Sequence, residues 1–154
     1  MPRIGRKRVI ASASDRTWDL ISDPHHLARW WPLAQRVEDV REEGEGLRWT
    51  LALRSERGTQ VRADYTGGEI EPGHRFAWDQ QVEGTPFERI LRSARVEIGV
   101  MSAGDDDDKT LVSLTSHERL RGLSRLGSPM MRAAAGRRLD EALENLDHAL
   151  GGPA

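Results

Sequence analysis

The chain has 154 residues, a formal net charge of -2 and no cysteine. This length suits one domain with its own core, so we expect residues 1–154 to form a single domain. The missing thiols exclude disulfide bonds, thiolate metal sites and cysteine nucleophiles. The nearly balanced charge gives no overall attraction to nucleic acid or anionic membranes. The sequence has neither the apolar run of a signal peptide nor the roughly 18 apolar residues of a membrane span, so we expect a cytoplasmic protein.

A first strand and a short helix are predicted at the start of the chain. Residues 6–13 can form a strand with Val9 on one face. Ser14 or Asp15 then suits the N-cap of a helix over 14–22, because either side chain can accept a hydrogen bond from a free backbone N–H of the first turn.

Asp23-Pro24 is typical of the start of a second short helix. Aspartate is a favoured N-cap, and a proline at the first helical position loses no hydrogen bond, because its N–H would have no partner there. The helix runs over 24–31 and ends before Pro32, since the residue before a proline avoids the α conformation. The adjacent Trp30 and Trp31 point about 100° apart on a helix, so we expect one in the core and one at a cavity edge.

Six strands are predicted between residues 33 and 116, where apolar residues recur with period two. Turn sequences such as Glu71-Pro72-Gly73 and Gly84-Thr85-Pro86 separate them. An antiparallel sheet with one polar face has to bury the other. Several residues of the inward face are candidates to line a cavity: Trp49, Leu51, Tyr65, Phe76, Trp78, Gln80, Ile98, Leu114 and Ser116.

Two segments between the strands carry signals of their own. Residues 87–92, FERILR, fit either a helical turn before the next strand or the start of that strand. The acidic run Asp105–Asp108 follows Gly104 and indicates a hairpin tip that is kept in water by charge repulsion. The spaced aspartates of a calcium loop are absent from it, and no pattern in the chain predicts a metal site or a cofactor.

Apolar residues recur at helical spacing from Ser128 to Leu150 and predict a long C-terminal helix. Ser128-Pro129 suits its start, and Gly151-Gly152-Pro153 suits its end. The small residues at 133–136 either leave volume between helix and sheet or let the helix approach the sheet closely. The candidate cavity residues on this helix are Met131, Ala135 and Leu139.

Three local patterns, and the order of strand, two helices, six strands and helix, resemble the START-like superfamily, also called SRPBCC. VIASASDRTWDLISDPHHLARWWP at 9–32 is similar to its strand–helix–helix entry. EPGHRFAWDQ at 71–80 resembles its strand with P-G and F-x-W, and RLDEALENLDHAL at 138–150 resembles its closing helix. The polyketide cyclase/dehydrase-like branch is the most similar. The resemblance implies an α+β helix-grip fold, with a curved antiparallel sheet of about seven strands wrapped around a long C-terminal helix.

The same resemblance implies binding of a small hydrophobic molecule, such as a lipid, a polyketide-like or a quinone-like compound. The cavity would lie between the sheet and the C-terminal helix of a monomer or homodimer. An alternative is a polyketide cyclase/dehydrase-type enzyme, in which Tyr65, Gln80, Ser116 and Glu118 are the available proton-handling groups. The sequence does not assign its catalytic residues.

A second alternative is a protein-interaction module that resembles homologues of the heat-shock ATPase activator, which share the double-tryptophan entry. Leu120, Leu123 and Leu126 would contact the partner, or they would instead seal the mouth of the cavity. Binding of nucleic acid is not expected, because outward arginines such as Arg48 and Arg62 are balanced by acidic neighbours.

Overall fold

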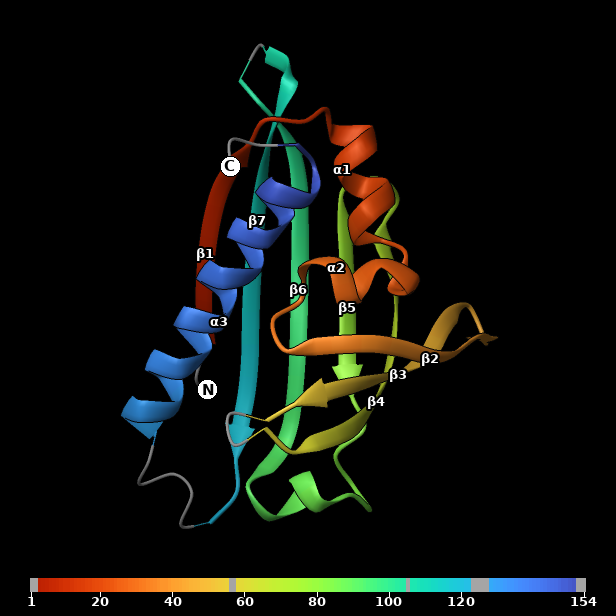
Figure 1. Cartoon of the computed structure of the whole chain (residues 1–154), viewed down its shortest axis with the longest axis vertical. Helices are drawn as coiled ribbons and strands as arrows, with labels where there is room; N and C mark the ends of the chain where they lie inside the picture. Colours follow the sequence, from red (N-terminus) through yellow and green to blue (C-terminus); the bar gives the residue numbers. More distant parts are fainter. Residues whose placement is uncertain (1–2, 56–57, 105, 123–127, 152–154) are drawn as a thin grey trace.

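The computed structural model describes residues 3–55, 58–104, 106–122 and 128–151 (Figure 1). The predicted order of elements is confirmed. In chain order they are β1 (Arg3–Ile10), α1 (Ser14–Ile21), the 3-10 helix η1 (Pro24–His26), α2 (Leu27–Trp30), β2 (Ala34–Glu43), β3 (Gly46–Arg54), β4 (Gln60–Glu71), β5 (Arg75–Gln80), the 3-10 helix η2 (Pro86–Arg89), β6 (Leu91–Ala103), β7 (Asp106–Leu120) and α3 (Ser128–Ala149). None of the helices in the described ranges is long and apolar enough to cross a bilayer.

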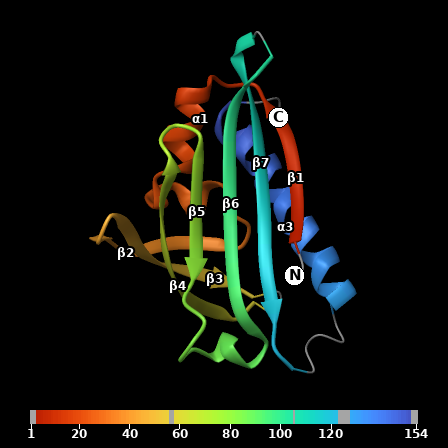
Figure 2. The same cartoon turned by 180° about the vertical axis from the view of Figure 1, so that it is seen from behind.

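The seven strands form one antiparallel sheet in the order β1-β7-β6-β5-β4-β3-β2. Strands β5, β6, β7 and β1 follow the long axis of the molecule, and β2 and β3 cross that direction at a steep angle (Figure 1). The view from behind shows the outer face of the sheet, with all three α-helices on the far side (Figure 2). The expected α+β fold, a curved sheet around a long C-terminal helix, is therefore confirmed.

Gly67 of β4 makes room for an aromatic side chain at the centre of the sheet. It pairs with Leu47 of β3 on one side and with Trp78 of β5 on the other. A Cβ at this position would lie 2.8 Å from Cη2 of Trp49 and 2.6 Å from the carbonyl oxygen of Ala77. Only glycine fits here, and the Trp49 ring packs against the β4 backbone as a result.

The sequence predicts the N-cap correctly for the second of the two short helices and wrongly for the first. The Asp23 carboxylate accepts a hydrogen bond from the backbone N–H of His25 at 3.0 Å, as expected for an N-cap. The N-cap of α1 is instead Ala13, without a side-chain cap, so the prediction of Ser14 or Asp15 is wrong. The Ser14 hydroxyl lies 3.2 Å from that of Ser102 in β6, which draws it away from its own helix.

The first strand turns Ile10, and not Val9, towards the core. Ile10 is fully buried, whereas Val9 is 51% exposed on the outer face. On the inner side, the Arg8 guanidinium donates two hydrogen bonds to one carboxylate oxygen of Asp147, at 3.1 and 2.9 Å. This ion pair fastens the C-terminal part of α3 to the edge of the sheet.

The core contains a continuous cluster of aromatic rings that is centred on Trp78. The centroid of its ring lies 6.1 Å from that of Trp30, 5.2 Å from that of Trp31 and 6.3 Å from that of Trp49. Most of these contacts are edge-to-face, which the ring quadrupole favours. The cluster comprises Trp18, Trp30, Trp31, Trp49, Tyr65, Phe76 and Trp78.

The small residues of α3 let its first half lie close to β1. Ala135 and Gly136 are buried, and a Cβ on Gly136 would fall 2.5 Å from Nη2 of Arg6. Further along, large apolar residues of α3 fill the space over the sheet. They are Leu139, Leu143 and Leu146, and Leu150 directly after the helix adds to them.

A smaller apolar cluster closes the end of the sheet near η2. Leu120 is buried there against Leu91 and Val82, so it does not present an exposed surface to a partner. Leu123 and Leu126 lie outside the described residues, as does the first aspartate of the expected hairpin tip between β6 and β7. The segment 87–92 takes the first of its two predicted forms, a helical turn that is followed by a strand from Leu91.

Candidate functional site

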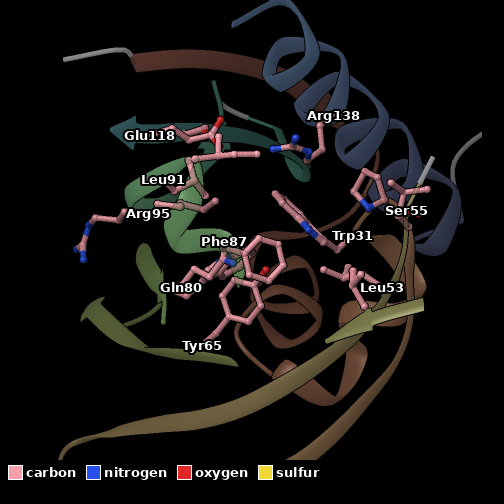
Figure 3. A pocket seen from close by; sticks show the side chains of 18 of the residues that line it. Trp31, Leu53, Ser55, Tyr65, Gln80, Phe87, Leu91, Arg95, Glu118 and Arg138 are labelled. Atoms are coloured by element: carbon pink, nitrogen blue, oxygen red, sulfur yellow. The ribbon is translucent and has the colours of Figure 1, made fainter. Parts of the chain in front are cut away.

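A cavity of about 380 Å³ lies between the first half of α3 and the end of the curved sheet. Its wall is built from the loop after α2, the ends of β3, β5 and β7, the middle of β4, the turn η2 and the start of β6 (Figure 3). This volume falls within the range of about 300–1,000 Å³ that is typical of small-molecule sites.

Local hydrogen bonds hold the wall segment between β5 and β6 in place. The Thr85 hydroxyl donates to the carbonyl oxygen of Val82 at 2.6 Å, and the Glu88 carboxylate accepts from the backbone N–H of Gly84 at 2.7 Å. Gly84 has a φ of 79°, a left-handed conformation that suits glycine. The resulting turn presents Phe87 to the cavity.

The loop between α2 and β2 forms another part of the wall. The Asn145 amide of α3 donates to the carbonyl oxygen of Trp30 at 3.1 Å and thereby ties the end of α2 to α3. Trp30 is fully buried in the core, and Trp31 faces the cavity. Leu33 follows with a φ of 66°, an unusual conformation for a residue with a large side chain, and is half-exposed at the cavity edge.

Most of the cavity surface is apolar and aromatic. Trp31 and Trp78 belong to the aromatic cluster, so the cavity is continuous with the core. Rings of this kind provide flat, polarisable contact surfaces for a planar or aliphatic ligand. The apolar lining comprises Trp31, Pro32, Leu33, Leu53, Val61, Trp78, Phe87, Ile90, Leu91, Ala94, Val96 and Met131.

Five polar side chains face the same cavity without a partner. Tyr65, Gln80, Ser116, Glu118 and Arg138 all line it. Within the part of the chain that the structure describes, their side chains make no hydrogen bond or ion pair. Their polar atoms are open to the cavity and are not fully buried. The cavity therefore offers hydrogen-bonding groups that the protein itself leaves free.

Tyr65 is electrostatically connected to both charged members of this group. Burial raises the pKa of its hydroxyl well above the ordinary value, the nearby Arg138 guanidinium opposes this rise, and the Glu118 carboxylate adds to it. Tyr65 is therefore a neutral hydrogen-bond donor at physiological pH. In Figure 3, Arg138 and Glu118 lie on one side of the cavity, and Tyr65, Gln80 and Phe87 lie on the other.

Arg95 lines the cavity by its stem alone. Its guanidinium donates to Asp79 at 2.7 Å and to Glu97 at 3.1 Å on the outer side of the sheet. Figure 3 shows the charged end pointing away from the cavity. Arg95 is thus committed to the surface and is not available to a ligand.

The predicted cavity residues divide into three groups. Those that line the cavity are Trp31, Tyr65, Trp78, Gln80, Ser116 and Met131. Ala135 lines a neighbouring hollow of about 10 Å³ that also touches Ser116 and Glu118. Those that lie in the packed core are Trp30, Trp49, Leu51, Phe76, Ile98, Leu114 and Leu139.

Sequence reasoning missed some of the lining residues. Phe87 and Leu91 belong to the segment whose form the sequence left open. Arg138 could have been found, because it follows Met131 and Ala135 at helical spacing and so shares a face with them. No sequence signal marks Leu33, whose position depends on the backbone conformation after Pro32.

The fold and the cavity define a START-like protein of the helix-grip class. Residues 1–151 match the model of the family described as polyketide cyclase / dehydrase and lipid transport. The chain therefore belongs to this family, which is part of the SRPBCC superfamily. A comparison with curated proteins finds no significant match.

Solved structures share this fold at low sequence identity. A START superfamily protein from Mycobacterium smegmatis superposes with a TM-score of 0.76 at 13% identity, over 96% of both chains. The Zhui aromatase/cyclase from Streptomyces sp. R1128 gives a TM-score of 0.77 at 19% identity, over 98% of both chains. The di-domain ARO/CYC StfQ from the steffimycin biosynthetic pathway gives 0.77 at 9% identity, over 97% of this chain and 50% of that one.

Proposed function

We propose that residues 1–154 act as a single domain that binds a small hydrophobic molecule in the cavity beneath α3. The observation that carries the proposal is the combination of an apolar wall with polar groups that have no protein partner. Trp31, Trp78 and Phe87 provide apolar contact, and Tyr65 and Gln80 provide directed hydrogen bonds. Such a mixture is typical of ligand sites, in which a few polar groups fix the orientation of a largely apolar molecule.

The class of ligand follows from the same wall. Lipid, polyketide-like and quinone-like molecules all combine an apolar body with carbonyl or hydroxyl oxygens, which Tyr65 and Gln80 can engage by hydrogen bonds. The family description, which names polyketide cyclases and lipid transport, supports the lipid and polyketide-like members of this range.

Native mass spectrometry of the purified protein, before and after denaturation, tests the proposal. A discrete hydrophobic molecule that is lost on unfolding would support it and give the chemical class of the ligand. Calorimetric titration with 2-naphthamide, a planar apolar probe with one carbonyl group, follows as a second test. Phe87→Ala should weaken its binding, and Ile70→Ala, which removes an exposed apolar side chain of β4 outside the cavity, serves as the control. Absence of both a bound molecule and probe binding would contradict the proposal.

A polyketide cyclase/dehydrase-type enzyme is a second candidate. The observation that favours it is that Glu118 and Tyr65, a carboxylate and a neutral phenol, face one apolar cavity. Glu118 would accept a proton from the carbon between two carbonyl groups, and Tyr65 would hydrogen-bond to the oxygen that gains negative charge. Incubation with a short poly-β-ketone thioester would test this. Faster cyclisation or dehydration than in buffer, slowed by Glu118→Gln and unchanged by Glu144→Gln on the exposed side of α3, is the supporting result.

A further inference from the structure

The geometry points to an acidic ligand: a hydrophobic molecule with a carboxylate or enolate oxygen that pairs with Arg138. This inference rests on the proposed function, because it assigns the polar end of the molecule in the same cavity. It also gives the ligand an orientation, with its charged end under α3 and its apolar body against the aromatic wall.

The first observation is the state of the three arginines that line the cavity. Arg95 is held outside by Asp79 and Glu97, and Arg54 is exposed at the rim. Arg138 is only partly exposed and has no ion-pair partner in the described ranges of the chain. A guanidinium that has lost part of its hydration without gaining a partner is a ready site for an anion.

The second observation is the balance of free charge around the cavity. Arg138 and Arg54 carry positive charge, and Glu118 is the carboxylate that lines the same space. Glu118 lies on the same side as Arg138 in Figure 3, yet the two groups do not form an ion pair. The free charges therefore favour an anionic group of the ligand over a cationic one. Because Glu118 does not pair with Arg138, the guanidinium is available to an acidic oxygen of the ligand.

The third observation is that Tyr65 faces the same cavity from the side across from Arg138. Its hydroxyl is a donor without a partner in the described structure. An enolate or carboxylate paired with Arg138 would receive charge-assisted hydrogen bonds from the guanidinium, and Tyr65 could donate to a second oxygen of the same ligand. The rest of the molecule would then lie against Trp31 and Phe87, which both line the cavity.

Two probes of the same shape, one charged and one neutral, separate the contribution of the charge to binding from that of the apolar body. The affinities of the full-length protein for 2-naphthoate and for neutral 2-naphthamide are measured by isothermal titration calorimetry at pH 7.5 and low salt. We expect the wild type to bind the carboxylate about 10-fold more tightly, the lower end of what a charge-assisted hydrogen bond provides in a partly hydrated site. In Arg138→Met this preference should disappear, while the affinity for the amide changes little.

Three further variants distinguish a specific pairing from a general effect of charge. Arg138→Lys should keep part of the preference. Glu118→Gln should increase it, because it removes a negative charge beside the site. Arg137→Met, the matched control, removes the same charge from the neighbouring exposed position of α3 and should leave both affinities unchanged.

The outcomes separate this inference from the proposed function. If both probes bind equally in the wild type, or if the preference survives Arg138→Met, the pairing with Arg138 is refuted and the hydrophobic site stands. If neither probe binds, both are refuted. Thermal melting of each variant shows whether it is folded, and a preference that rises in Glu118→Gln and falls in Arg138→Met supports the pairing even if one variant is less stable.

Discussion

Replacing Tyr65 by phenylalanine tests whether a cavity residue serves the ligand or the fold. The hydroxyl has no hydrogen-bond partner in the part of the chain that the structure describes, and the side chain is 8% exposed. Its removal costs no protein hydrogen bond and relieves the desolvation of a polar group. The ring remains and keeps its stacked contact with Trp49, whose ring centroid lies 6.0 Å away.

The expected effect on stability is small or favourable. Replacing an unpaired polar group by an apolar one of the same shape is neutral or stabilising, so the free energy of unfolding should stay constant or rise by up to about 1 kcal/mol. For a chain of this size, that corresponds to an increase in Tm of up to about 4 °C. Binding should change in the opposite direction. Loss of one neutral hydrogen bond, about 0.5–1.5 kcal/mol, would raise the Kd for 2-naphthamide about 2- to 13-fold.

Urea denaturation and calorimetric titration on the same preparations measure both quantities. Ser113→Ala removes a hydroxyl from the outer face of β7, away from the cavity, and should alter neither. A loss of stability above about 1 kcal/mol in Tyr65→Phe, with unchanged affinity, would show that the hydroxyl serves the fold and would refute the reasoning.

The pH dependence of stability provides a second measurement on the same variant. The pKa of Tyr65 is raised by burial in the folded protein, so the unfolded chain ionises first. The stabilisation of the neutral hydroxyl is complete below the unfolded value of about 10 and is lost as the pH rises above it. Tyr65 is the only tyrosine of the chain, so its ionisation can be followed directly by ultraviolet absorbance. Tyr65→Phe should lack this component of the alkaline loss of stability, and a normal titration of the wild type near pH 10 would contradict a buried hydroxyl.

Three further predictions concern the frame around the cavity. Gly67→Ala places a Cβ within 3 Å of three heavy atoms and should lower the free energy of unfolding by about 2–3 kcal/mol in urea denaturation, whereas Gly58→Ala, in an open turn, provides a milder comparison. Arg8→Met leaves the buried Asp147 carboxylate without its cation and should lower the free energy of unfolding by about 1–2 kcal/mol, less than for a fully buried pair because Arg8 is partly exposed. An unchanged midpoint of urea denaturation would show that the pair contributes nothing. Hydrogen bonds from Arg62 and Arg36 lower the pKa of Glu38 to about 2, so any stabilisation by this carboxylate is present above the ordinary value of 4.5 and is lost as the pH falls towards 2. Carbon NMR should show the titration of Glu38 with a midpoint near 2, and Arg62→Gln should raise that midpoint.

The alternation of apolar residues predicted the inner face of most strands correctly, because one face of the sheet is covered and the other is hydrated. Trp49, Tyr65 and Leu114 are buried as their phase indicates. At β1 the sequence did not indicate which face is buried, and the structure buries Ile10 and exposes Val9. This strand is short of apolar residues and lies at the edge of the sheet, so its face is determined by the pairing with β7 and the contact with α3.

The cap of α1 was beyond the reach of local sequence rules. Ser14 is a good N-cap by type, but its hydroxyl lies within 3.4 Å of Thr110 and 3.2 Å of Ser102, which are far away in the sequence. A tertiary contact therefore competes with the helix for the same side chain. The sequence pattern shows that Ser14 can cap the helix, but its contacts with β6 and β7 place its hydroxyl elsewhere.

Whether an inward-facing residue of the sheet lines the cavity or lies in the packed core depends on which half of α3 it faces. Opposite the second half of the helix, leucines fill the space, and the residues beneath them, such as Ile98 and Leu114, are packed. Opposite the first half, Met131, Ala135 and Arg138 leave room, and the sheet residues at that level carry oxygen and nitrogen atoms that nothing in the described structure satisfies. Gln80 and Ser116 follow Trp78 and Leu114 by two residues on the same face of their strands. Leu114 is packed in the core and Trp78 lies at its edge, whereas Gln80 and Ser116 line the cavity with polar groups that have no partner in the described structure. A ligand with matching polar atoms would stabilise the folded protein from this space, because a molecule that binds only the native state raises the free energy of unfolding.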